Sequence, residues 1–118
     1  WPFSKMLITY YGEPDPGLPE DGKRRFRLKA VLLEAFGILK AKDAAPIVLR
    51  TLESDKDFYP VLVQACIAAG RLRLKSALPI LDKDSGHFEK NTRAAAVLAA
   101  KLIRGEITEA EFEQSVQA

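Results

Sequence analysis

The sequence has one histidine and one cysteine, too few for the common metal and nucleophilic sites. His87 lies in the polar segment DKDSGHFEK, with no second histidine and no CxxC motif beside it, so a metal would lack ligands and a nucleophile would lack a base. Cys66 lies in the apolar run VLVQACIAAG, and such a thiol is typical of a protein core. We therefore predict no catalytic residue, no metal site and no cofactor.

The sequence also lacks a charge excess and a long apolar run. Its 18 Lys and Arg residues against 16 Asp and Glu residues give a net charge of +2. This balance is far from the basic excess typical of nucleic-acid-binding proteins, so we expect a protein partner rather than nucleic acid. Glu34 and Lys101 interrupt apolar runs that fall short of the roughly 20 residues of a membrane span. We therefore predict no membrane segment. The chain begins with Trp1 and shows no signal peptide, so any address label is expected upstream, and the compartment stays open, with the cytoplasm favoured over the periplasm.

Aromatic residues make up only 8% of the chain, whereas apolar residues make up 47% and include many Ala and Leu. Ala and Leu favour helix, so the composition predicts an all-α fold in a single domain, residues 1–118. Residues 1–11 are expected to form an extra N-terminal helix, because their apolar positions follow one helix face. Residues 12–22 are rich in proline and glycine and predict a loop, and residues 23–118 form the repeats described next.

A thirteen-residue segment occurs twice in the sequence, 33 residues apart. AFGILKAKDAAPI begins at Ala35 and AAGRLRLKSALPI begins at Ala68, with seven identical positions. Gly37 and Gly70 are predicted to lie where a first helix ends, and the leucine two residues later is predicted to pack the turn against the core. Each copy is therefore interpreted as the turn of a helical hairpin.

A second helix is predicted to begin directly after each turn. Asp43 and Ser76 occupy equivalent positions and belong to the residue types that cap helix N-termini, so we expect them to be N-caps. Pro46 and Pro79 would then lie three residues inside their helices, where proline removes no intrahelical hydrogen bond. The second helices are expected near residues 43–53 and 76–84.

A third, less regular hairpin follows the two clear copies. In NTRAAAVLAAKLIRG, Asn91 or Thr92 is expected to cap a helix that ends at Gly105. The next helix opens with TEAE, a capping box in which Thr108 and Glu111 exchange hydrogen bonds with backbone amides. Its remaining residues are mostly polar, which suits a terminal repeat with one uncovered face.

The pattern A-x-G-x-L-x-x-x-x-A-x-P-x-L/I resembles short HEAT-like repeats, of the type known from phycobilisome lyases and many bacterial proteins. The resemblance covers residues 24–105 in two good copies and one degenerate copy. It implies an α-solenoid of about three stacked antiparallel hairpins, an armadillo-type superhelix whose second helices line the concave face. Ankyrin and tetratricopeptide repeats have similar periods, but their signature residues are missing here.

Basic residues recur at equivalent positions of the two best copies. The pairs are Lys40 and Arg73, Lys42 and Lys75, and Arg50 and Lys83, with Arg71 and Arg104 at the same offset. Equivalent positions of stacked hairpins are neighbours, so we expect short basic ladders. Two interpretations stay open: a functional basic surface, or the attraction of cations to helix C-termini, which does not account for Lys42 and Lys75 because they precede an N-cap. The predicted binding residues are Lys42, Arg50, Glu53, Arg73, Lys75 and Lys83.

The predicted function is that of a non-enzymatic scaffold or adaptor that binds another protein, one with an acidic patch. Carried over from HEAT-like proteins, its second-helix face would include Asp43, Pro46, Arg50, Glu53, Ser76, Pro79, Lys83 and Glu113. Two alternatives stay open. One is a nucleic-acid-associated module with a basic concave face. The other is an accessory domain of a larger enzyme. This alternative is suggested by the first residue of the chain, which is Trp1 rather than Met.

Overall fold

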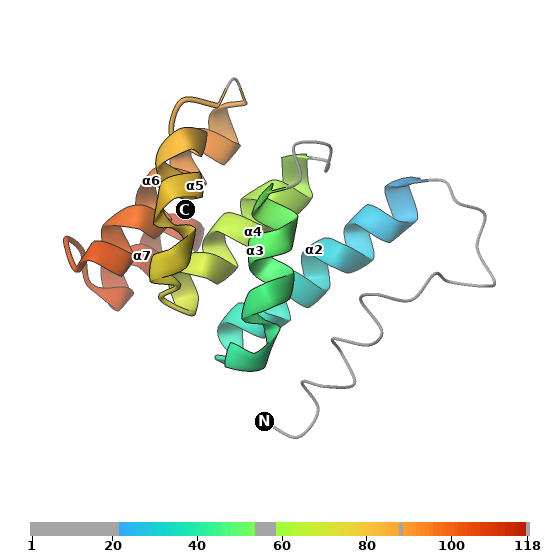
Figure 1. The fold of residues 1–118 in the computed structure, drawn as a ribbon, viewed down its shortest axis with the longest axis horizontal. Coiled ribbons are helices and arrows are strands. Elements are labelled where there is room, and N and C mark those ends of the chain that lie inside the picture. The colour runs from blue at the N-terminus through green and yellow to red at the C-terminus, as the bar shows by residue number, and fades with distance from the viewer. Residues whose placement is uncertain (1–21, 54–58, 88, 118) are drawn as a thin grey trace.

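The computed structural model describes residues 22–53, 59–87 and 89–117 (Figure 1). Six α-helices make up most of this part of the chain, which contains no β-strand, so the predicted all-α fold is confirmed. The expected N-terminal helix and proline-rich loop, residues 1–21, lie outside the described residues. The elements are α2 (Gly22–Ile38), η1 (Lys42–Ala44), α3 (Ala45–Glu53), α4 (Tyr59–Arg71), η2 (Lys75–Ala77), α5 (Leu78–Asp84), α6 (Lys90–Arg104) and α7 (Glu109–Gln117), where η denotes a short 3₁₀ helix.

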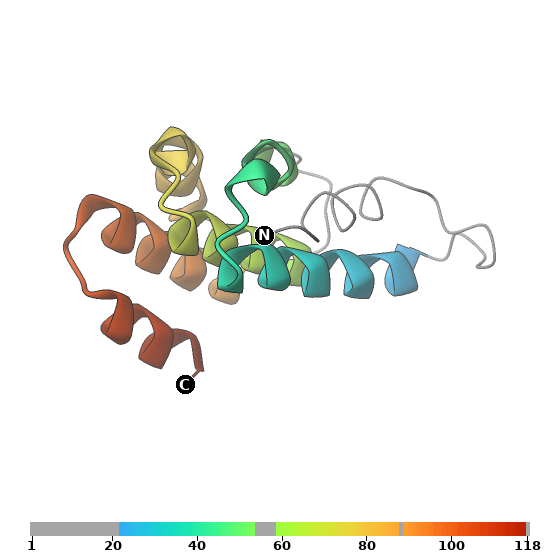
Figure 2. The ribbon, with the colours of Figure 1, turned by 90° about the horizontal axis from the view of Figure 1, so that it is seen from below.

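The helices form a central layer with further helices on both of its faces (Figure 2). α2, α4 and α6 lie side by side in the central layer, with α4 packed against both of the others. α3 and α5 lie on one face, where α3 packs on α4 and α5 packs on α6. α7 lies on the other face. The largest fully buried side chains include Leu33, Phe36, Leu81, Leu102 and Phe112.

The position of α7 contradicts one prediction. The sequence predicts Glu113 on the same face as Arg50, whereas α7 lies across the central layer from α3 and α5 (Figure 2). Phe112 accounts for the difference, because it is fully buried and a Cβ on Gly70 would lie 3.1 Å from its Cζ atom. An ion pair between Glu113 and Arg71 also holds α7 on the face of the central layer opposite α3 and α5. The third hairpin therefore does not repeat the geometry of the first two.

The repeated glycines allow neighbouring helices of the central layer to approach closely. A Cβ atom at Gly37 would lie 3.2 Å from the Cα of Ala68, and one at Gly70 would lie 3.1 Å from the Cα of Ala99. Glycine is the residue that accommodates such backbone contacts, because it has no Cβ. Gly37 and Gly70 lie in the last turns of α2 and α4, near the helix ends, as predicted. Their lack of a side chain serves helix packing rather than helix termination.

The helix ends themselves are formed by Lys40, Arg73 and Gly105. These residues have φ angles of 54°, 52° and 78°, in the left-handed region. After each of them, the next backbone amide donates a hydrogen bond to the carbonyl five residues earlier, at 2.9, 3.0 and 2.9 Å. This is the Schellman arrangement that satisfies the last carbonyls of a helix. The predicted end of α6 at Gly105 is confirmed.

The predicted N-caps of the second helices are wrong. Asp43 and Ser76 lie inside η1 and η2, and the N-cap of α5 is Ala77, which provides no side-chain hydrogen bond. A side-chain cap at these positions would have bound the amides of Ala45 and Leu78, which instead donate to the backbone carbonyls of Lys42 and Lys75, so the 3₁₀ turns themselves satisfy these donors. Pro46 and Pro79 are consequently the second residues of their helices.

The cap of α6 also differs from the prediction. Glu89, rather than Asn91 or Thr92, is the N-cap, and its carboxylate accepts hydrogen bonds from the amides of Asn91 at 3.1 Å and Thr92 at 2.7 Å. These bonds lower the pKa of Glu89. The predicted capping box of α7 is confirmed, since the Thr108 amide donates to Glu111 Oε1 and the Glu111 amide donates to Thr108 Oγ1, both at 3.1 Å.

Candidate binding surfaces

α3 and α5 carry exposed polar side chains and lie on the same face of the central layer (Figure 2). Val48 and Leu52 are buried one turn apart on α3, so Arg50 lies on the opposite, exposed side of the helix. Lys83 is exposed at the equivalent position of α5. The name "α3/α5 surface" denotes the exposed residues Lys42, Pro46, Arg50, Glu53, Lys75, Pro79 and Lys83.

Three cations of the α3/α5 surface take no part in holding the fold together. The side chains of Lys42, Arg50 and Lys75 form no ion pair or hydrogen bond with any residue that the structure describes. Their charges are therefore directed to solvent. Of the six predicted binding residues, five are exposed on η1, α3, η2 and α5: Lys42, Arg50, Glu53, Lys75 and Lys83.

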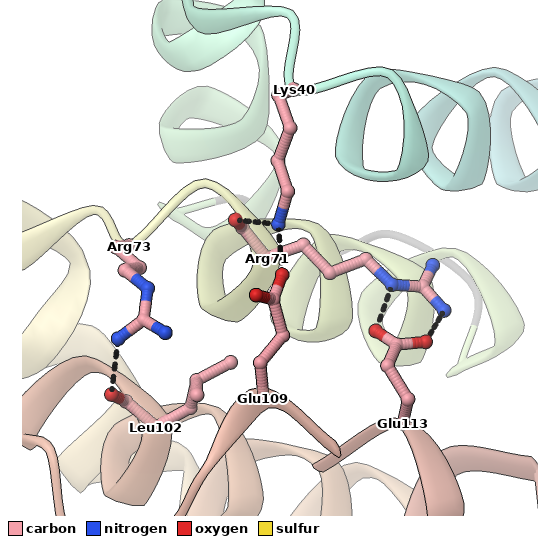
Figure 3. Close-up of polar contacts among 6 residues, drawn as sticks. All are labelled: Lys40, Arg71, Arg73, Leu102, Glu109 and Glu113. Atoms are coloured by element: carbon pink, nitrogen blue, oxygen red, sulfur yellow. Dashed lines mark hydrogen bonds and ion pairs between the residues drawn. The ribbon is translucent and has the colours of Figure 1, made fainter.

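The sixth predicted residue, Arg73, joins two helices of the central layer. Its Nη1 atom donates to the carbonyl of Leu102 in the last turn of α6 at 3.3 Å (Figure 3). Lys40, its equivalent, donates through Nζ to the carbonyl of Arg71 at the end of α4 at 2.9 Å. Each cation thus lies at the negative end of the next helix in the layer, where positive charge is favoured. The Lys40/Arg73 pair is explained by helix-end electrostatics.

A polar junction lies where α7 meets the ends of α2 and α4 (Figure 3). Arg71 is 7% exposed, and its Nε and Nη2 atoms donate to the two carboxylate oxygens of Glu113 at 2.9 and 3.0 Å. Such a bidentate pair is among the strong hydrogen-bonded contacts of proteins. The predicted Arg71/Arg104 ladder does not form, because Arg71 is buried at this junction whereas Arg104 pairs with Asp82 at 2.6 Å.

The second ion pair of the junction joins Lys40 to Glu109, with Nζ 2.6 Å from Oε1. Hydrogen bonds from Lys40 and Arg71 lower the pKa values of Glu109 and Glu113, respectively, which keeps both carboxylates charged. Sequence reasoning missed this junction, although a signal was available: Glu109, Phe112 and Glu113 have the i, i+3, i+4 spacing of one helix face.

Two open hollows lie on the surface of the described residues. One, of about 350 Å³, is bordered by the junction, and Arg71 is among its lining residues. The Nη1 atom of Arg71 is buried without a hydrogen-bond partner among the described residues. The other, of about 470 Å³, lies between the end of α5 and the start of α6, lined by Ser85, Lys90, Arg93, Ala94, Val97 and Leu98. Both are shallow.

The cysteine and the histidine considered as candidate site residues in the sequence both take part in the packing or hydrogen bonding of the fold. Cys66 is fully buried, as expected of a core thiol, and burial raises its pKa to about 12. His87 is half-buried and accepts a hydrogen bond from the amide of Glu89 at 3.0 Å. Among the described residues, no group of three His, Cys, Asp or Glu side chains could hold a metal, and no helix is long and apolar enough to cross a membrane.

Comparisons with protein-family models, with curated proteins and with solved structures found no match to this chain. A functional proposal for this protein therefore depends on the surfaces and contacts of the chain itself.

Proposed function

We propose that this protein is a non-enzymatic binding module, a short HEAT-like α-solenoid whose α3/α5 surface binds an acidic patch of another protein. One observation carries the proposal: exposed cations recur at equivalent positions of consecutive hairpins. Lys42 and Lys75 are one such pair, and Arg50 and Lys83 are the other. Neither Lys42, Lys75 nor Arg50 contacts a carboxylate in the described part of the chain.

The packing of the central layer supports the solenoid part of this proposal. α2, α4 and α6 lie side by side, and the glycine contacts between them recur along the chain, at Gly37 and at Gly70. α3 and α5 follow the first two of these helices through equivalent 3₁₀ turns. A terminal unit that departs from the repeat, as α7 does, is typical of repeat arrays, because its outer face has no neighbour.

The energetics favour a partner held by several charges at once. A single exposed ion pair contributes only about 0.2–1 kcal/mol, so no one lysine or arginine would hold a partner. Complementary charges mainly increase the association rate and select the partner. The cations of the α3/α5 surface are carried by helices and helical turns, which lose little conformational entropy on binding. We therefore expect binding that weakens as salt is added.

Two charge-reversal variants of equal net charge test this proposal. Arg50→Glu with Lys83→Glu reverses two charges on the α3/α5 surface, and Lys90→Glu with Lys101→Glu makes the same change at exposed positions of α6. In pull-downs from a cell extract, quantified by mass spectrometry, a partner recovered by the wild type and by the α6 variant should be lost with the α3/α5 variant. Equal recovery of every partner by all three proteins would contradict the proposal.

A further inference from the structure

α7 occupies a groove made by side chains and backbone from three different helices. Phe112 is fully buried beside Gly70 of α4, and the same position of Gly70 faces Ala99 of α6. Arg71 holds Glu113, and Lys40, after the end of α2, holds Glu109 (Figure 3). The name "α7 groove" is used for Lys40, Gly70, Arg71 and Ala99.

The contacts of α7 with the α7 groove follow a simple pattern. One face of α7 carries a carboxylate, an aromatic ring and a second carboxylate at positions i, i+3 and i+4, which are Glu109, Phe112 and Glu113. The two carboxylates bind cations that belong to different helices, and the ring enters the space beside a glycine. All three contacts are made by side chains of α7, so they do not depend on its covalent connection to α6.

The connection between α6 and α7 is short. Residues 105–108 link the two helices, and Gly105 forms the turn with a φ of 78°. Four extended residues span roughly 13 Å. Because Gly105 also accepts ordinary extended φ angles, this link can open at the cost of the backbone hydrogen bonds from Gly105 and Glu106 that end α6.

We propose that α7 is exchangeable, and that the α7 helix of a second copy of this chain can occupy the groove in trans, which gives a reciprocal dimer. A second copy is the occupant because every copy carries a helix with the matching pattern and charge. The dimer retains both ion pairs and the buried ring of each groove. The balance between monomer and dimer therefore depends mainly on the conformation of residues 105–108 and on the protein concentration. The exchange uses the face opposite the α3/α5 surface and does not depend on the function proposed above.

Charge exchange between two full-length chains tests this inference. In the Arg71→Glu chain the new carboxylate repels Glu113 of the same chain, and in the Glu113→Arg chain the new guanidinium repels Arg71 of the same chain. When the two chains swap α7, one groove holds two wild-type residues and the other holds the two introduced residues, so each groove again pairs one carboxylate with one guanidinium. After joint incubation in mild urea and dialysis, native mass spectrometry of isotope-labelled chains should show the heterodimer exceeding either homodimer at least about tenfold. Hydrogen exchange should show α7 protected in the mixture and unprotected in each variant alone.

The double variant Arg71→Glu with Glu113→Arg is the matched control. It restores the pair within one chain, so it should remain monomeric at concentrations where the mixture dimerises. If the buried carboxylate of the Arg71→Glu chain prevents folding, the exposed pair provides the same test with Lys40→Glu and Glu109→Lys chains, whose side chains are 48% and 51% exposed in the wild type. Mixtures that stay monomeric with both pairs would overturn the proposal. So would a heterodimer in which α7 remains unprotected, or trans binding of a synthetic α7 peptide without dimerisation of the chains.

Discussion

The substitution Gly70→Ala tests how closely α4 approaches α6. The added Cβ would lie 3.1 Å from the Cα and Cβ atoms of Ala99 and from Cζ of Phe112. Two effects oppose each other, because alanine is about 1 kcal/mol better than glycine in a helix, whereas overpacking costs about 1–3 kcal/mol. One of the crowded atoms is the Cα of Ala99, which belongs to the backbone of α6 and cannot move aside as the end of a flexible side chain can. We therefore expect a net loss of about 1–2 kcal/mol in the free energy of unfolding.

Urea unfolding followed by circular dichroism measures this loss, with Gly86→Ala as the matched control. A Cβ at Gly86 has its nearest neighbour 3.7 Å away, so this variant should be as stable as the wild type. Hydrogen exchange supplies a second readout, since displacement of Phe112 should speed exchange in α7 more than in α5. If Gly70→Ala unfolds at the same urea concentration as the wild type or a higher one, the account of the repeated glycine as a close contact is refuted.

Three further predictions concern α7 and the helix ends. Phe112→Ala removes the one fully buried side chain of α7 and should lower the free energy of unfolding by about 3–5 kcal/mol in the same assay; a loss below about 1 kcal/mol would contradict its burial. Gly105→Ala puts a Cβ at a φ of 78° in open space, so it should cost about 1 kcal/mol through backbone strain alone, and an unchanged urea midpoint would show that no strain arises. Arg71 lowers the pKa of Glu113 below 4.5 in the folded state, so this pair stabilises the protein above pH 4.5 and the stabilisation is lost as the pH falls through the lowered pKa. The melting temperature should therefore fall less steeply with acidification in Glu113→Gln than in the wild type, and parallel curves would refute the pairing.

The exposure of the α3/α5 surface could be predicted because it follows from local periodicity. Once Val48 and Leu52 face the core of an amphipathic helix, Arg50 must face outwards. The burial of Arg71 could not be predicted in the same way. Its partner, Glu113, lies 42 residues further along the chain, and nothing within one helical turn of Arg71 indicates a carboxylate.

The sequence by itself determined the features that depend on neighbouring residues. Helix propensity, the capping box at Thr108 and the stop at Gly105 involve atoms within one or two turns, so the all-α fold and most helix boundaries follow from local chemistry. Tertiary structure decided the side of the central layer on which α7 lies. That choice depends on the space beside Gly70 and on the cations Lys40 and Arg71, which come together only when α2, α4 and α6 are already packed.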